Sequence, residues 1–137
     1  SQALNKEEAI EEANYVLTLV KPYNITYPIA IDVEAIENDS FRQENLSASE
    51  LTDVIIAFCD TIKAAGYTPL IYSNLLYFMD NVELERLEGY DKWFAGYQTA
   101  SPYYPYRYAM WQYTSTGSIN GVSGNVDINI AMKNLKK

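Results

Sequence analysis

Two carboxylates stand two residues apart at the end of a short apolar run that follows a proline. The run is PIAIDVE, residues 28–34, and the acids are Asp32 and Glu34. In a strand, residues two apart point to the same face, so these carboxyl groups would be neighbours. Two neighbouring carboxylates do not both ionise easily, and we therefore expect one of the two pKa values to be raised. A protonated carboxylic acid beside a carboxylate is the equipment for cleaving a glycosidic bond.

A plainer interpretation of this pair is that the acids only end a strand at the solvent edge. Eighteen of the 137 residues are Asp or Glu, so an Asp-x-Glu triplet is not rare. The alternating residues Ile29, Ile31 and Val33 would form a purely apolar opposite face, as in a strand covered by helices. In α/β sheets and barrels, sites are built at the carboxyl ends of such strands. The pattern leaves both interpretations open.

Asp127 is a third candidate carboxylate, in the segment GNVDIN, residues 124–129. In an extended strand Asn125, Asp127 and Asn129 would share one face, with Val126 and Ile128 on the other. An edge strand with a polar outer face explains this alternation equally well. The pattern by itself therefore favours a structural role for Asp127 over a catalytic one.

Aromatic residues are concentrated in one stretch of the chain. Residues 90–113 contain ten of them: Tyr90, Trp93, Phe94, Tyr97, Tyr103, Tyr104, Tyr106, Tyr108, Trp111 and Tyr113. Some of these rings are expected to pack in strands, where tyrosine is favoured. Residues 103–106 (YYPY) are harder to bury together and predict an exposed loop. Sugar rings and single-stranded nucleic acid both stack on exposed aromatic side chains.

The overall composition narrows the chemistry. The chain has no histidine and one cysteine, which excludes a Ser-His-Asp triad, a Cys-His pair and the usual zinc sites. Its formal net charge of −8 argues against binding to nucleic acid or to an anionic membrane. No apolar run approaches the roughly 20 residues that span a bilayer. We therefore expect no metal and no cofactor, with carboxylates for acid–base chemistry and aromatic rings for recognition.

The elements that must position these residues alternate between helix and strand. Apolar spacing and capping signals predict helices over residues 5–20 and from Ser47 to a terminal Gly66. Strands are predicted at 28–34, 68–73, 93–98, 108–114 and 125–130, with short helix and loop over 74–87. This order is typical of an α/β fold with parallel strands, followed by a strand-rich end with glycine turns. No linker or repeat divides residues 1–137, which we interpret as a single domain or part of one.

At this point the chain resembles the catalytic domain of glycoside hydrolase family 25, the Chalaropsis-type lysozymes or N-acetylmuramidases. The stretches that carry the resemblance are the first helix, YPIAIDVE, AFCDTIKAAGYTPLIYS, KWFAGY and MWQYTSTGSINGVSGNVDIN, in this order and spacing. The resemblance implies an irregular TIM-like β/α barrel. It also implies hydrolysis of the β-1,4 bond between N-acetylmuramic acid and N-acetylglucosamine in bacterial peptidoglycan.

The resemblance suggests roles for individual residues. Glu34 matches the family's general acid, Asp32 the carboxylate two residues before it, and Asp127 the carboxylate near the end of the domain. Either Asp127 is a nucleophile or ion-pair stabiliser, or the acetamido group of the substrate attacks, held by Asp32 or Asp127. Residues that fall where the family lines its groove are Tyr72, Tyr97, Trp111, Gln112 and Tyr113. The implied partner is the peptidoglycan glycan strand, met outside the cell, in the cell wall, or by a phage-encoded lysin.

One departure from the family pattern concerns the start of the chain. The family's domain begins with a strand that bears another active-site Asp, whereas this sequence opens at a mid-domain helix. We therefore expect residues 1–137 to be a partial catalytic domain, lacking its N-terminal strands, and weakly active or inactive alone. Open sheet edges also predict self-association.

Two other functions fit parts of the pattern. A non-catalytic glycan-binding module would use the aromatic residues and leave the acids silent. A chitinase-like barrel glycosidase also places an Asp two residues before its acid, but it carries a further acid two positions earlier, where this chain has Ala30.

Overall fold

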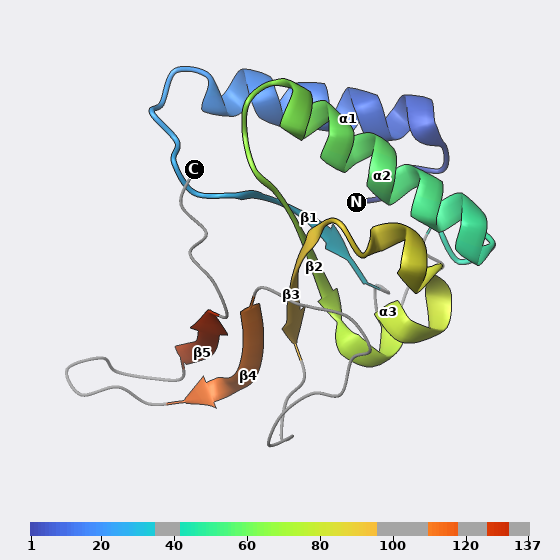
Figure 1. Cartoon of the computed structure of the whole chain (residues 1–137), viewed down its shortest axis with the longest axis vertical. Helices are drawn as coiled ribbons and strands as arrows, with labels where there is room; N and C mark the ends of the chain where they lie inside the picture. Colours follow the sequence, from blue (N-terminus) through green and yellow to red (C-terminus); the bar gives the residue numbers. More distant parts are fainter. Residues whose placement is uncertain (35–41, 96–109, 118–125, 132–137) are drawn as a thin grey trace.

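The chain folds into one mostly parallel sheet with helices packed on it (Figure 1). The computed structural model describes residues 1–34, 42–95, 110–117 and 126–131, with the backbone of the last two ranges. The elements in chain order are α1 (Lys6–Val20), β1 (Ile29–Val33), α2 (Ala48–Ala64), β2 (Pro69–Asn74), α3 (Leu75–Asn81), the 3₁₀ helix η1 (Leu84–Leu87), β3 (Asp91–Ala95), β4 (Met110–Gly117) and β5 (Val126–Ala131). The predicted α/β class with parallel strands is confirmed.

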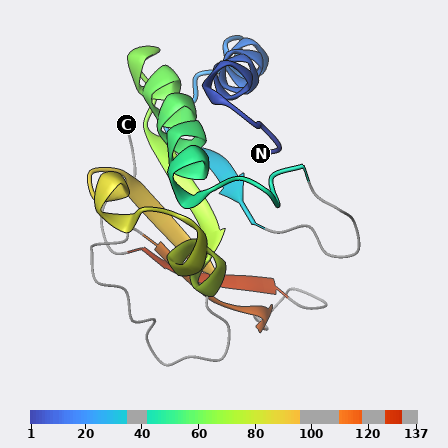
Figure 2. The same ribbon diagram turned by 90° about the vertical axis from the view of Figure 1, so that its right-hand side faces the viewer.

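The five strands of the sheet lie in sequence order, β1-β2-β3-β4-β5. β1 to β4 pair in parallel, and β5 pairs antiparallel with β4. Figure 2 shows β4 and β5 lying away from α1 and α2. The first four strands run in the same direction, so their carboxyl ends lie together along one side of the sheet. The candidate acids were predicted at such carboxyl ends. Within the described residues, β1 and β5 are the two edge strands.

The two long helices begin and end at the predicted signals. Asn5 caps α1 by accepting a hydrogen bond from the Glu8 amide, and the Glu8 carboxylate accepts from the Leu4 amide. Ser47 and Glu50 form a complete capping box at the start of α2. At the end of α2, Gly66 has a φ of 90°, the left-handed conformation in which glycine is favoured.

The core lies between the sheet and the helices. α2 packs against β1 and β2, and α1 lies beside α2 (Figure 1). β1 alternates as predicted, with Ile29, Ile31 and Val33 buried towards the helices and Ala30 and Asp32 exposed on the other face. Further along the sheet, Phe94 of β3 is fully buried against Phe78 of α3. The helices therefore cover one face of β1, and the acids are left on the other.

No helix within the described ranges is long and apolar enough to cross a membrane.

A lysine is buried among these apolar side chains. Lys92 of β3 is 0% exposed, and its Nζ donates a hydrogen bond to the carbonyl oxygen of Glu88 at 3.2 Å. Burial lowers the pKa of Lys92 to about 8, although the negative charges of Asp91 and Glu88 oppose this change. Near pH 7 the fold therefore holds a buried ammonium group, which is costly to desolvate.

We expect this lysine to make stability rise with pH. The folded chain releases the Lys92 proton near pH 8, whereas an unfolded lysine holds its proton to about pH 10.4. Between these values the unfolded state binds more protons, so the free energy of unfolding should increase by about 1–2 kcal/mol from pH 7 to pH 9.5. Urea titrations of the wild type and Lys92→Met at both pH values measure this contribution. An equal pH dependence in the two proteins would contradict it.

Candidate active site

Asp32 and Glu34 lie together on the exposed face of β1. The strand ends at Val33, and Glu34 follows directly. Both residues are exposed, and their carboxyl groups lie close enough for Asp32 to act on the pKa of Glu34. The predicted placement of the two acids at the carboxyl end of a helix-covered strand is therefore confirmed.

The pair has the electrostatics expected of unequal acids. The pKa of Glu34 is raised above its ordinary value, first by partial desolvation, then by the negative charge of Asp32 and the hydrogen bond between the two carboxyl groups. The α-amino group of Ser1 acts in the opposite direction. The raised pKa lets Glu34 keep its proton to higher pH than an ordinary glutamate, as a general acid requires.

Removing the charge of Asp32 should remove its contribution to the raised pKa of Glu34. In Asp32→Asn, we expect the pKa of Glu34 to fall, because a neutral amide no longer repels the Glu34 carboxylate. NMR titration of the Glu34 side-chain carboxyl carbon measures the change directly. Asp80→Asn, which alters an exposed acid of α3, is the matched control and should leave the Glu34 titration unchanged. A Glu34 pKa that is the same in Asp32→Asn would contradict the pairing.

Aromatic side chains continue from the acids across the sheet. The strand register aligns Asp32 of β1 with Tyr72 of β2, and Tyr72 with Trp93 of β3. The two aromatic rings meet edge to face, with centroids 4.8 Å apart, and both side chains are half-buried. This places Tyr72, a predicted groove residue, in one row with a predicted acid. Trp93 was not predicted as a site residue, although it is one of the ten aromatic residues concentrated in residues 90–113.

The other predicted site residues lie in the last strands or outside the described residues. The backbone register pairs Trp111 of β4 with Phe94 and Gln112 with Ala95, and Tyr113 is the next residue of the same strand. Asp127 is the second residue of β5, which starts beside the end of β4, where Val126 pairs with Gly117. Tyr97 and the residues 103–106 lie outside the described residues.

Asp127 therefore lies on the side of the sheet where β1 to β4 have their carboxyl ends, as Asp32 and Glu34 do. Four strand pairings separate it from them. Neighbouring strands are about 4.8 Å apart, so in a flat sheet β1 and β5 would be separated by about 19 Å. Only curvature of the sheet can bring the Asp127 backbone closer to Glu34. The role of Asp127 stays a prediction.

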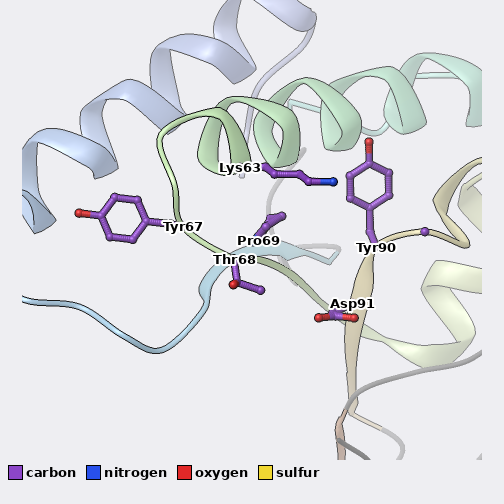
Figure 3. Close-up of a pocket in the computed structure, with 7 residues that line it drawn as sticks. Lys63, Tyr67, Thr68, Pro69, Tyr90 and Asp91 are labelled. Atoms are coloured by element: carbon purple, nitrogen blue, oxygen red, sulfur yellow. The ribbon is translucent and has the colours of Figure 1, made fainter. Parts of the chain in front are cut away.

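Two of the hollows among the described residues flank the sheet. One, of about 440 Å³, runs along the free edge of β1; Asp32, Glu12 and Tyr15 are among the residues that line it. The other, of about 240 Å³, lies at the amino ends of β2 and β3 (Figure 3). There the Tyr90 side chain points towards α2, where its hydroxyl donates to Asp60 at 2.7 Å. The first hollow adjoins the acids, whereas the second is at the opposite end of the strands.

Comparison with known proteins identifies the family. The sequence profile of Glycosyl hydrolases family 25 matches residues 1–122 of the chain. The chain belongs to this family. The resemblance drawn from the sequence is therefore confirmed.

Curated proteins similar to this chain include two phage proteins. The "Lysozyme" of Streptococcus phage Cp-7 is 32% identical over 81% of this chain and 33% of that protein. The "D-alanyl-L-alanine endopeptidase" of Streptococcus phage B30 is also 32% identical, over 86% of this chain and 28% of that protein. The chain spans about a third of the length of the curated relatives it matches.

A solved structure shows the same arrangement of elements. The modular autolysin LytC from Streptococcus pneumoniae is 31% identical and superposes with a TM-score of 0.73, over 93% of this chain and 31% of that chain. The same autolysin in complex with a synthetic peptidoglycan ligand gives a TM-score of 0.70 at 28% identity, over 93% of this chain and 31% of that chain. The family 25 chain is thus similar to an autolysin whose structure has been solved with a peptidoglycan ligand.

Proposed function

We propose that this chain takes part in hydrolysis of the β-1,4 bond between N-acetylmuramic acid and N-acetylglucosamine in bacterial peptidoglycan. The observation that carries the proposal is the Asp32–Glu34 pair, in which the pKa of Glu34 is raised at the carboxyl end of β1. Membership of family 25 and the likeness to an autolysin solved with a peptidoglycan ligand support the substrate class.

In this proposal Glu34 is the general acid. Its proton passes to the oxygen of the departing sugar while the C–O bond breaks and positive charge develops on the ring that remains. Asp32 lies beside Glu34, and its negative charge raises the pKa of Glu34, which keeps that proton available. Either Asp127 serves as the nucleophile or ion-pair stabiliser, or the acetamido group of the substrate attacks while Asp32 or Asp127 holds it.

The aromatic row explains how a glycan strand would be held. Tyr72 and Trp93 present half-buried rings next to the acids, and sugar rings have apolar faces that pack on such rings. We assign Tyr72, Tyr97, Trp111, Gln112 and Tyr113 to the groove.

We also propose that residues 1–137 form a single, partial catalytic domain of an irregular TIM-like barrel. Alone, this domain is expected to have weak or no activity and to self-associate at its sheet edges. A protein of this kind acts outside the cell, at the cell wall, or as a phage lysin.

Digestion of purified peptidoglycan tests the activity. The longest natural form of the protein should release reducing sugars, and mass spectrometry should show fragments that end in reducing N-acetylmuramic acid. Fragments that end in reducing N-acetylglucosamine, or cleavage confined to the stem peptides, would overturn the proposal. Residues 1–137, with their mass checked by mass spectrometry, are assayed in parallel, and we expect them to hydrolyse peptidoglycan weakly or not at all. Full activity of this chain would contradict that expectation.

The Tyr72–Trp93 row also favours a second candidate, a non-catalytic glycan-binding module. Such a module would bind insoluble peptidoglycan and release nothing from it, even in the longest natural form. A peptidase activity like that named for the phage B30 relative has less support in this chain. The sequence has no histidine, and its one cysteine, Cys59, is fully buried with its pKa raised to about 12.

A further inference from the structure

We propose that Ser73 of β2 is a positioning residue for Glu34, because its hydroxyl holds the peptide plane from which Glu34 extends. The proposal rests on the function proposed above and adds to it a residue that never touches the substrate. It is carried by one buried hydrogen bond between neighbouring strands and by the surroundings of that bond.

The hydrogen bond joins two strands at the point where the candidate acid begins. The Ser73 hydroxyl donates to the carbonyl oxygen of Val33 at 2.5 Å, and the strand register pairs the same two residues. The carbonyl of Val33 and the amide nitrogen of Glu34 belong to one rigid, planar peptide group. Fixing the carbonyl oxygen therefore fixes the orientation of the Glu34 backbone, at a position where β1 has already ended.

The Ser73 hydroxyl lies among apolar side chains, where a polar group is unfavourable unless it is hydrogen-bonded. Ser73 is 0% exposed, and its partners in the register, Val33 and Phe94, are buried apolar residues. Burying a hydroxyl among apolar groups costs free energy unless it is hydrogen-bonded. A valine or alanine has an apolar side chain suited to these neighbours, but neither side chain could donate a hydrogen bond to the Val33 carbonyl oxygen.

The donor itself is held firmly. The next residue, Asn74, ends β2 and caps α3, and its side chain accepts a hydrogen bond from the Tyr77 amide at 3.2 Å. The Ser73 hydroxyl also lies 3.1 Å from the carbonyl oxygen of Asn74. Ser73 is thus fixed between a strand pairing on one side and the start of a helix on the other, so it can act as a fixed reference for β1.

The test compares Ser73→Ala with Thr52→Ala. Thr52 of α2 is likewise 0% exposed and donates to a backbone carbonyl, that of Ala48 at 2.6 Å, but it lies away from the acids. Both variants should lose stability. Only Ser73→Ala should lower the Glu34 pKa, measured by NMR titration of the carboxyl carbon, because a looser backbone separates Glu34 from Asp32 and exposes it to water. Among the described residues, the charged groups that act on Glu34 are Asp32 and the α-amino group of Ser1, and neither is altered.

Activity gives the second measurement. In the longest natural form of the protein, we expect Ser73→Ala to lower kcat on peptidoglycan about 10-fold with KM little changed, and the basic limb of the kcat–pH profile to move to lower pH. Ser73→Cys, which keeps the size and a weak donor, should recover part of both effects and covers the case in which Ser73→Ala does not fold. A wild-type Glu34 titration in a folded Ser73 variant would overturn the proposal. Because that titration needs no substrate, failure of the proposed hydrolysis would be recognised separately, in the wild-type assay.

Discussion

We expect Glu34→Gln to lower kcat for peptidoglycan hydrolysis roughly 100- to 10,000-fold, the usual contribution of a general acid. Glutamine keeps the size and polarity of the side chain but has no proton to give to the departing sugar oxygen. Reducing-sugar release by the longest natural form of the protein measures the loss. Because the glutamine side chain can still occupy the groove, binding to insoluble peptidoglycan should stay near the wild-type level.

The free energy of unfolding of Glu34→Gln shows whether its loss of activity comes from unfolding. A raised Glu34 pKa means that the folded chain resists ionising this group, so above the ordinary glutamate pKa the ionised form reduces stability. Glu34→Gln removes that cost, and its free energy of unfolding at pH 7 should equal or exceed the wild-type value, by less than about 1 kcal/mol for an exposed pair. Glu11→Gln, at an exposed position of α1, is the matched control for activity. Unchanged release of reducing sugar by Glu34→Gln would remove Glu34 from the role of general acid.

The largest effect on stability is expected for Phe94→Ala. Phe94 of β3 is 0% exposed, and its ring meets that of Phe78 of α3 edge to face, with centroids 5.2 Å apart. Truncation removes a large apolar side chain and leaves a cavity, which typically costs about 3–5 kcal/mol. Because whole domains are stable by only about 5–15 kcal/mol, this change should bring the fold close to its limit. Urea denaturation followed by circular dichroism measures the loss.

Two further variants show whether the loss comes from the cavity. Phe94→Leu keeps most of the apolar volume and should cost about 1–2 kcal/mol. Tyr23→Ala truncates an aromatic residue that is 68% exposed and should change stability by less than about 0.5 kcal/mol. If Phe94→Ala lowers the free energy of unfolding no more than Tyr23→Ala does, the packing of Phe94 against α3 does not contribute to stability as expected.

The sequence by itself determined the features that depend on residues close together in the chain. The capping box of Ser47 and Glu50 and the terminal Gly66 predicted α2, because each signal acts within one helical turn. The alternation in β1 predicted that Asp32 and Glu34 share a face opposite Ile31 and Val33, because the side-chain period of a strand is two. That closeness, together with the charge of Asp32, was enough to predict one raised pKa.

Only the tertiary structure decided which distant residues meet the acids. Strand register brings Ser73 to Val33 across forty residues and Trp93 to Tyr72 across twenty-one, and no local pattern in the sequence encodes that alignment. The same holds for Lys92, whose burial follows from its place under the helices and not from its neighbours in the chain. Asp127 was found from the sequence, yet its separation from Glu34 is set by the four strand pairings between them. Pairing between strands is a long-range choice made by the packing of the whole sheet, and it is the physical reason why the acids were predictable and their surroundings were not.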